Sequence, residues 1–322
     1  MKLTRNADHV KSNIENVCKQ RGISNYYSRF SFSKVPINGQ ELHLSILNTP
    51  DPKGIILFTP GTNAYALLYG EYLIALAELG YKVVSYDPRS HGQSSGANGS
   101  YTIPELIDDL YELAHHFHHQ DKLPVFLSGS SQGGIVSFYC AAKEEKIANE
   151  EQRSAIIKGL ICHNIADLTA DNATELTRFP LLSSVMKKWI IASAKWMPEF
   201  PVSMWMYLDL KIEPVRNMGN AWSIIQKDPL LVDFVCLKTM ASLSNTPLAV
   251  PIDKIQTPLF LIQADNDTIF KTSYSKWVFD RLNCPKRMEV YAGLPHYMIV
   301  DYVPEFIGDV QEWLESQTHQ LS

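Results

Sequence analysis

The chain has 322 residues, of which 45% are hydrophobic and 20% charged, and its formal net charge is −5 at pH 7. This is the composition of an ordinary globular protein, and its slight acidity without a strongly basic cluster disfavours a nucleic-acid binder. The five cysteines are scattered and form no C-x-x-C pair, which disfavours a disulfide framework and a cysteine-based zinc site.

The N-terminal residues 1–26 are predicted to form a polar extension or a helix. Residues 1–20 lack the apolar core of a secretory signal, and no stretch of the chain is apolar for long enough to cross a bilayer. Even the most apolar region, residues 181–210, is interrupted by lysines, prolines and a glutamate. We therefore expect a cytoplasmic protein, and we keep a peripheral membrane contact open.

Strand and helix patterns alternate along residues 27–165. Strand-like runs at 27–35 and 41–47 flank an Asn-Gly pair, which is a hairpin signal, so these first strands should be antiparallel. A continuous apolar run at 54–59 is typical of a central parallel strand. The other elements predicted in this part are helices at 67–79, 102–117 and 134–142 and strands at 81–86, 123–128 and 155–162. Such alternation predicts a mostly parallel sheet with helices on both faces.

Residues 166–250 interrupt this alternation, because they contain mainly helical patterns without clear strands. The alternation resumes with strands at 258–264 and 286–291 and helices at 272–282 and 303–315. The interrupting block is therefore predicted to be a helical insertion into one α/β core, which residues 27–165 and 251–322 form together. It is not expected to be a tandem domain.

The inserted block is rich in large, adaptable side chains. Its tryptophans and methionines are Trp189, Trp196, Trp205, Trp222, Met186, Met197, Met204, Met206, Met218 and Met240. A small helical block has too little interior to bury all of them, so some should line a cleft. Methionine and aromatic walls favour an acyl or other apolar substrate over a sugar or a nucleotide.

Residues 129–133 read Gly-Ser-Ser-Gln-Gly between a strand-like run and a helical run. Gly-x-Ser-x-Gly in this setting is typical of the nucleophile elbow, a turn so tight that its flanking positions leave no room for a Cβ atom. Ser131 is central between Gly129 and Gly133 and is therefore the predicted nucleophile. An ordinary turn serine is the competing interpretation.

A serine hydroxyl becomes a good nucleophile only when a base takes its proton, and that base is commonly a histidine oriented by a carboxylate. Two later strands run into Asp265-Asn-Asp267 and into Gly293-Leu-Pro-His296, which gives the chain order Ser, Asp, His of elbow enzymes. His296 is the predicted base. Asp267 is the predicted acid, with Asp265 as its rival and a helix N-cap as its alternative role.

These motifs resemble those of the α/β-hydrolases, and most of all their monoglyceride lipase and lysophospholipase branch. Residues 58–63 correspond to the family's oxyanion loop, and residues 87–94 correspond to its Asp-x-Arg-Gly-His-Gly-x-Ser loop. The chain departs from the family pattern at Pro60, Ser90 and Ala264, where members carry His, Gly and Gly. The register of the family's Gly-x-x-Asp motif favours Asp267 as the acid.

The resemblance implies an α/β-hydrolase fold with a helical cap and a serine hydrolase that needs neither a metal nor an organic cofactor. The implied substrate is a carboxylic ester of an apolar acyl group, such as a monoacylglycerol or lysophospholipid, cleaved through an acyl-enzyme. The backbone N–H groups of Thr62 and Gln132 would form the oxyanion hole, because Pro60 has no N–H to donate. The alternatives are a short-chain esterase or thioesterase, an acyltransferase, and a non-catalytic ligand-binding member of the fold.

Four histidines in one predicted helix look like a metal-binding cluster: His115, His116, His118 and His119. Residues 115 and 119 are one turn apart, as two ligands of one metal would be. However, the apolar face of this helix lies at 106, 110, 113 and 117, so most of the histidines should face solvent. A solvated helix face is therefore favoured, and no metal site is expected.

Overall fold

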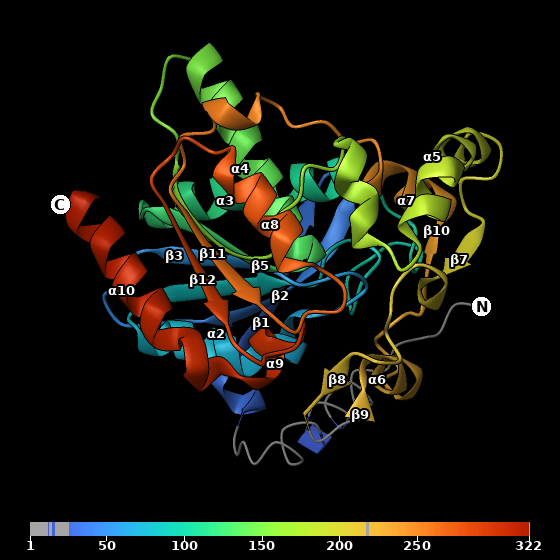
Figure 1. Ribbon diagram of the computed structural model, residues 1–322. Coiled ribbons are helices and arrows are strands. Elements are labelled where there is room, and N and C mark those ends of the chain that lie inside the picture. Colours follow the sequence, from blue (N-terminus) through green and yellow to red (C-terminus); the bar gives the residue numbers. More distant parts are fainter. Residues whose placement is uncertain (1–11, 13–14, 17–25, 217–218, 322) are drawn as a thin grey trace.

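The computed structural model describes residues 12, 15–16, 26–216 and 219–321. Its centre is an eight-stranded sheet with the strand order β1-β2-β4-β3-β5-β6-β11-β12 (Figure 1). Strand β2 is antiparallel to both of its neighbours, and the other pairs are parallel. The strands are β1 (Ser31–Ile37), β2 (Gln40–Leu47), β3 (Ile55–Thr59), β4 (Lys82–Tyr86), β5 (Val125–Ser130), β6 (Ile157–His163), β11 (Leu259–Ala264) and β12 (Lys286–Tyr291).

Helices cover both faces of this sheet, as the alternating pattern predicts (Figure 1). One face carries α3 (Ile103–Asp121), α4 (Gln132–Glu150) and α8 (Thr272–Asp280), and the other carries α2 (Gly70–Glu78), α9 (Met298–Asp301) and α10 (Val303–Leu321). The strand predicted to begin at residue 27 begins instead at Ser31, because Tyr27–Arg29 form a 3-10 turn. The N-terminal extension predicted over residues 1–26 lies mostly outside the described residues.

The histidine-rich helix α3 packs as its apolar spacing predicts. Its residues at 106, 110, 113 and 117 are buried, whereas His116 and His119 are exposed. His115 reaches the buried carboxylate of Glu144 at 3.0 Å, and His118 bonds the carbonyl of Leu123 at 2.9 Å. Two of these histidines therefore face solvent, and the other two bind neighbouring elements.

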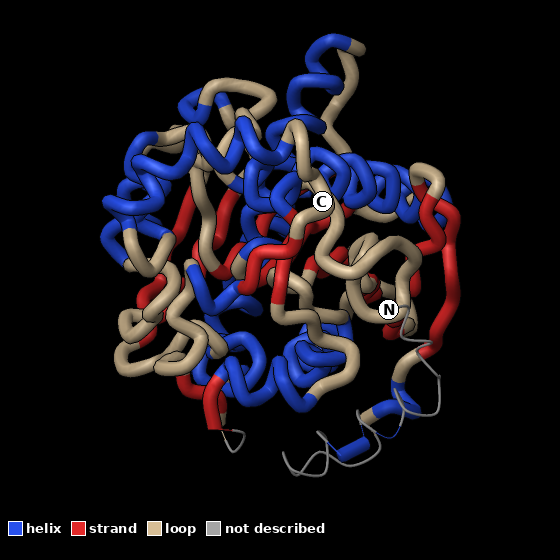
Figure 2. Tube along the Cα trace, turned by 90° about the vertical axis from the view of Figure 1, so that its right-hand side faces the viewer, coloured by secondary structure: helices blue, strands red, loops and turns tan. Residues whose placement is uncertain are grey.

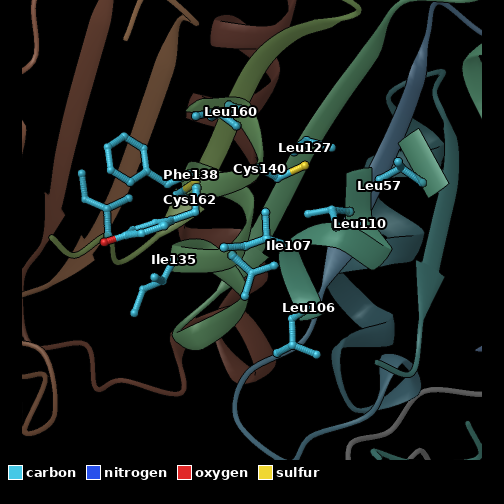
Figure 3. Close-up of a cluster of buried hydrophobic side chains, with 14 of the residues drawn as sticks. Leu57, Leu106, Ile107, Leu110, Leu127, Ile135, Phe138, Cys140, Leu160 and Cys162 are labelled. Carbon is cyan, nitrogen blue, oxygen red and sulfur yellow. The ribbon is translucent and has the colours of Figure 1, made fainter. Parts of the chain in front are cut away.

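Apolar side chains from the central strands and from the helices above them form a continuous core (Figure 3). Leu57, Leu127 and Leu160 come from neighbouring strands and are 0% exposed. Phe138 of α4 and Leu110 of α3 pack over them and are also fully buried. A sheet buried on both faces is held rigidly, so the loops at the strand ends have a fixed base.

Residues 166–250, termed the cap below, leave the sheet after β6 and return at its neighbour β11. The cap lies along one side of the sheet (Figure 1), the side that faces the viewer in Figure 2. Its helices are α5 (Pro180–Ala194), α6 (Ala221–Lys227) and α7 (Leu237–Leu243). The sequence shows no clear strands in this block, but the structure contains short ones: β7 (Pro201–Ser203) pairs with β10 (Phe234–Cys236), and β8 (Pro214–Val215) pairs with β9 (Gly219–Asn220). Strands of two or three residues are too short to give an alternating pattern.

None of the helices in the described part of the chain is long and apolar enough to cross a membrane.

Candidate active site

The elbow lies between β5 and α4, and Ser131 is at its tip. Ser131 has a φ of 56°, a strained left-handed backbone that a side chain seldom adopts outside functional sites. A Cβ atom on Gly129 would lie 2.2 Å from the carbonyl oxygen of Gly133, and one on Gly133 would lie 2.0 Å from that of Thr59. Both flanking positions therefore require glycine, which is the physical basis of the sequence motif.

The backbone of the elbow is anchored on both sides. The Ser131 N–H donates to the carbonyl of His163 at the end of β6, at 2.8 Å. The Ser131 carbonyl accepts the first bond of α4, from Gly134 at 2.9 Å. Ser131 is thus the N-cap residue of a long helix, whose dipole favours negative charge at this position.

Asp267 and His296, which belong to different loops, are in direct contact. Asp267 Oδ2 lies 2.8 Å from His296 Nδ1, and both residues are buried. Because an ionised carboxylate only accepts hydrogen bonds, Nδ1 must be the protonated nitrogen and Nε2 is free to act as a base. Asp265 is exposed and instead accepts from the Gly293 N–H at 2.6 Å, so of the two candidate acids only Asp267 contacts the imidazole.

The other carboxylate oxygen of Asp267 fixes its orientation. Oδ1 accepts from the N–H groups of Ile269 at 2.8 Å and Phe270 at 2.6 Å. Burial alone would raise the pKa of Asp267, but the charge and hydrogen bond of His296 outweigh it, and the pKa is lowered. Burial likewise disfavours charge on His296, yet Asp267 and Glu213 outweigh it, and the pKa of His296 is raised above its ordinary 6.5.

A second histidine, His163, lies behind this pair. Its ring centroid is 5.1 Å from that of His296, and its Nδ1 lies 3.2 Å from the Ser130 hydroxyl. Burial and the neighbouring His296 lower the pKa of His163 to about 3, so it is neutral at physiological pH. Donor atoms of His163, Asp267 and His296 lie within 4.8 Å of one another, which is close enough for a shared metal ion. The direct bond between Asp267 and His296 makes a hydrogen-bonded cluster the simpler interpretation.

The predicted oxyanion loop lies against the elbow. Thr62 Oγ1 donates to the side-chain oxygen of Gln132 at 3.1 Å, which joins the two residues predicted to supply N–H groups. The Gly61 N–H donates to the Tyr69 hydroxyl at 3.1 Å, and a Cβ on Gly61 would lie 3.4 Å from that of Ser131. The hydrogen bond from the Gly61 N–H to Tyr69 was not predicted, because no sequence motif marks a tyrosine whose hydroxyl binds the backbone of this loop.

The family departures at Pro60 and Ser90 are accommodated in different ways. The Pro60 carbonyl packs against Gly133, where a Cβ would approach it to 2.5 Å. Ser90 has a φ of 66°, the left-handed conformation that explains glycine at this place in the family. Its hydroxyl donates to the carbonyl of Ser100 at 2.8 Å and helps to hold the strained turn.

Two cavities meet at Ser131. The larger, of about 370 Å³, is mostly apolar and extends under the cap, where Met186, Met206 and Met240 line it. The smaller, of about 50 Å³, is bordered by both Ser131 and His296. Thr62 and Ser131 border both cavities. A ligand in the larger cavity would therefore reach Ser131, and His296 borders the smaller cavity next to it.

The expected cap residues reach the cleft only in part. Met186, Met206 and Met240 contribute to the wall of the larger cavity. Trp189, Trp196 and Trp205 are 72%, 87% and 44% exposed and do not line either cavity. Indole rings are large and rigid, whereas flexible thioether chains adapt more easily to the wall of a cavity of this size. The tryptophans instead leave much apolar surface in contact with solvent.

Comparisons with known proteins agree with this geometry. The family model described as serine aminopeptidase, S33, matches residues 50–302, well over half of the chain. The chain is 22% identical over 256 residues to the monoglyceride lipase homolog of monkeypox virus, covering 77% of this chain and 83% of that protein. It is 22% identical over 283 residues to the human monoglyceride lipase, covering 84% of this chain and 85% of that protein.

Among solved structures, the chain matches a soluble variant of monoglyceride lipase from Saccharomyces cerevisiae in complex with a substrate analogue. The TM-score is 0.71 at 16% identity, and the match covers 89% of this chain and 96% of that one. This likeness shows the fold, which is that of the α/β-hydrolases, as the sequence motifs predicted.

Proposed function

The chain belongs to the serine aminopeptidase S33 family of α/β-hydrolases, and from this premise we propose that it cleaves carboxylic esters of apolar acyl groups through an acyl-enzyme. The observation that carries the proposal is the meeting of two cavities at Ser131, one of them apolar and the other bordered by His296. An ester with its acyl chain in the apolar cavity would present its carbonyl carbon to Ser131.

In the proposed reaction, His296 Nε2 takes the proton of Ser131 as the serine oxygen attacks the ester carbonyl carbon. Asp267 holds the imidazole in the required tautomer and stabilises its charged form. The tetrahedral intermediate collapses, the ester bond to the alcohol oxygen breaks, and His296 donates its proton to the leaving alcohol. A water molecule then attacks the acyl-enzyme by the same proton transfers, releasing the acid and restoring Ser131.

The backbone N–H groups of Thr62 and Gln132 are proposed to hold the oxyanion. Gln132 is the first residue of α4, so its N–H has no partner within the helix. The hydrogen bond between the Thr62 and Gln132 side chains keeps the two loops together. Such donors typically contribute about 3–4 kcal/mol each to transition-state stabilisation.

The proposed substrate is a monoacylglycerol or a lysophospholipid-like ester. The apolar cavity of about 370 Å³ falls within the range of small-molecule sites, and its lining suits a hydrocarbon chain. Relatives named as monoglyceride lipases favour the same class.

Contact with a lipid surface through the cap is also proposed. Leu181, Val185 and Trp189 follow each other at four-residue spacing on α5 and are 87%, 70% and 72% exposed. Leu182 and Met186, one position further along the helix, line the apolar cavity. An exposed apolar stripe next to the wall of an acyl cavity would let a lipid pass from a membrane into the site.

Hydrolysis of p-nitrophenyl esters from acetate to palmitate, with Ser131→Ala as the control, tests the proposal. We expect an optimum at medium or long chains that the Ser131→Ala variant lacks, while its fold is intact by circular dichroism. An optimum at acetate or butyrate would favour a short-chain esterase. Turnover that persists in Ser131→Ala would reject the nucleophile.

Absence of turnover on any ester leaves two further outcomes, which a fluorophosphonate probe separates. Labelling that depends on Ser131 would indicate a thioesterase or an acyltransferase with another acceptor. No labelling would indicate a non-catalytic ligand-binding protein and reject the proposed function.

A further inference from the structure

A glutamate of the cap lies fully buried beside the proposed catalytic loops. Glu213 is 0% exposed, and within the described part of the chain it forms no ion pair with a lysine or an arginine. Burial raises its pKa above the ordinary range. An unpaired buried carboxylate is costly, so its retention at this place requires a specific set of partners.

Those partners belong to the two loops that carry Asp267 and His296. Oε1 of Glu213 accepts from the backbone N–H of His296 at 2.6 Å. Oε2 accepts from the Thr268 hydroxyl at 2.6 Å and from its N–H at 3.4 Å. Thr268 directly follows Asp267 in the chain, so one carboxylate joins the backbone of the acid loop to that of the base loop.

The chain segment that carries Glu213 is itself fixed to the core. Three residues further on, the Arg216 N–H donates to Asp301 Oδ2 at 2.9 Å, and its guanidinium donates to the Asp301 carbonyl at 3.2 Å. Asp301 ends α9, which follows His296 closely in the chain. These bonds connect the segment that carries Glu213 to the helix that follows the base loop.

The charged and titratable groups around the His296 imidazole come from three elements. Asp267 approaches from the β11–α8 loop, Glu213 from the cap, and His163 from the end of β6. Tyr297 is next in the chain, and burial raises the pKa of its phenol, which stays neutral. Two carboxylates thus face one histidine, whose neighbour His163 is uncharged.

We propose that Glu213 is a positioning residue for His296. It fixes the base loop against the acid loop, and its negative charge favours the imidazolium that forms when His296 takes the serine proton. This inference rests on the proposed function of Ser131, Asp267 and His296. Because Glu213 lines neither cavity, it acts through His296 and not on the substrate.

The pH dependence of activity tests this role. Glu213→Gln keeps the size and one accepting oxygen for the His296 N–H, can donate from its amide to the Thr268 hydroxyl, and removes the charge. We expect the acid limb of kcat/KM for a p-nitrophenyl ester, and of the labelling rate by a fluorophosphonate, to move to lower pH by about one unit. The direction follows because removing a negative charge lowers the pKa of His296. A merely structural role would lower the plateau and leave the limb in place.

Two further variants complete the test. Glu213→Ala also removes the bridge between the loops, and we expect kcat to fall about tenfold to a hundredfold with KM nearly unchanged. Asp209→Asn is the matched control, because the Asp209 side chain is also a cap carboxylate but pairs with Arg178 at 2.9 Å. Asp209 contacts Glu213 only through its backbone carbonyl, which the substitution leaves in place. It should reproduce the wild-type profile.

The outcomes separate this inference from the proposed function. If Ser131→Ala is inactive and unlabelled while Glu213→Gln keeps the wild-type acid limb, the role of Glu213 is rejected and the triad stands. If Ser131→Ala stays active, the proposed function itself fails. An equal shift in Asp209→Asn would assign the effect to net charge and also overturn the role of Glu213.

Discussion

The sheet and the cap place their apolar side chains in opposite ways. Leu127 in β5 is 0% exposed and packs against both neighbouring strands and the helices above them. Leu181 in α5 is 87% exposed. The difference shows that the sheet uses apolar residues to hold a rigid frame, whereas the cap uses many of them to line a cavity and to face outward.

The two regions are nevertheless joined close to Ser131. The Asn63 side chain, in the oxyanion loop, donates to the cap carbonyls of Val232 at 3.1 Å and Phe234 at 2.6 Å. The Tyr65 hydroxyl donates to Asp228 of the cap at 2.8 Å. The cap segment around residues 228–234 is therefore hydrogen-bonded to the loop beside Ser131. The contrast with the sheet applies mainly to α5.

The largest expected effect concerns Asp267, which lies in the loop after strand β11 of the sheet. Asp267→Asn should lower kcat by about 10³–10⁴-fold, because an amide that donates to Nδ1 leaves the proton on Nε2 and removes the base. KM for a p-nitrophenyl ester should change little, since Asp267 lines neither cavity. Steady-state kinetics measure both constants.

Asp265→Asn is the matched control for this variant. Asp265 is two residues away, is exposed and contacts the Gly293 N–H instead of the imidazole. Its kcat should stay within about twofold of the wild type, as is usual for a surface change remote from the chemistry. Equal losses in the two variants would contradict the assignment of Asp267.

A smaller effect is expected on stability, where a leucine-to-alanine substitution in the sheet is compared with one in the cap. Leu127→Ala should lower the free energy of unfolding by about 2–5 kcal/mol, because it leaves a cavity in a close-packed layer. Leu181→Ala should change it by less than about 0.5 kcal/mol, because its side chain is already in solvent. Urea unfolding followed by circular dichroism measures both. A large loss in Leu181→Ala would mean that α5 belongs to the stable core.

The same contrast explains what sequence alone predicted. The alternation of strands and helices predicts the order of the elements in the sheet and its covering helices, because most of these elements are long enough to show an apolar run or a clear period. The elbow was predictable since Gly129 and Gly133 have no room for a Cβ. The fold class was therefore predicted correctly, and the residues singled out at the three strand ends lie close to one another.

The short strands of the cap and the contact of Glu213 could not be predicted from the sequence, for physical reasons. These strands have two or three residues, so no alternation is visible. Glu213 reads in the sequence as one more surface glutamate, and only the fold reveals that it reaches His296, 83 positions away. For the acid, the register of the Gly-x-x-Asp motif favoured Asp267 over Asp265, and only the loop geometry adds the contact between Asp267 and the imidazole.

The smallest effect concerns the exposed stripe of α5. We expect a variant with Leu181→Ser, Val185→Ser and Trp189→Ser to bind phosphatidylcholine vesicles at least about tenfold more weakly than the wild type, because each side chain would otherwise bury apolar area in the bilayer. Cosedimentation with vesicles measures the binding. Hydrolysis of a soluble p-nitrophenyl ester should be unchanged, since none of the three residues lines the cavities.

Val290→Ser is the control for this stripe, because Val290 is 45% exposed on β12 of the sheet, outside the cap. It should bind vesicles like the wild type. If the wild type does not bind, or if the triple variant binds equally well, the outward apolar residues of α5 have another use. Loss of binding confined to the α5 variant would instead mean that the two regions divide the work, with the sheet holding the reacting groups and the cap meeting the lipid.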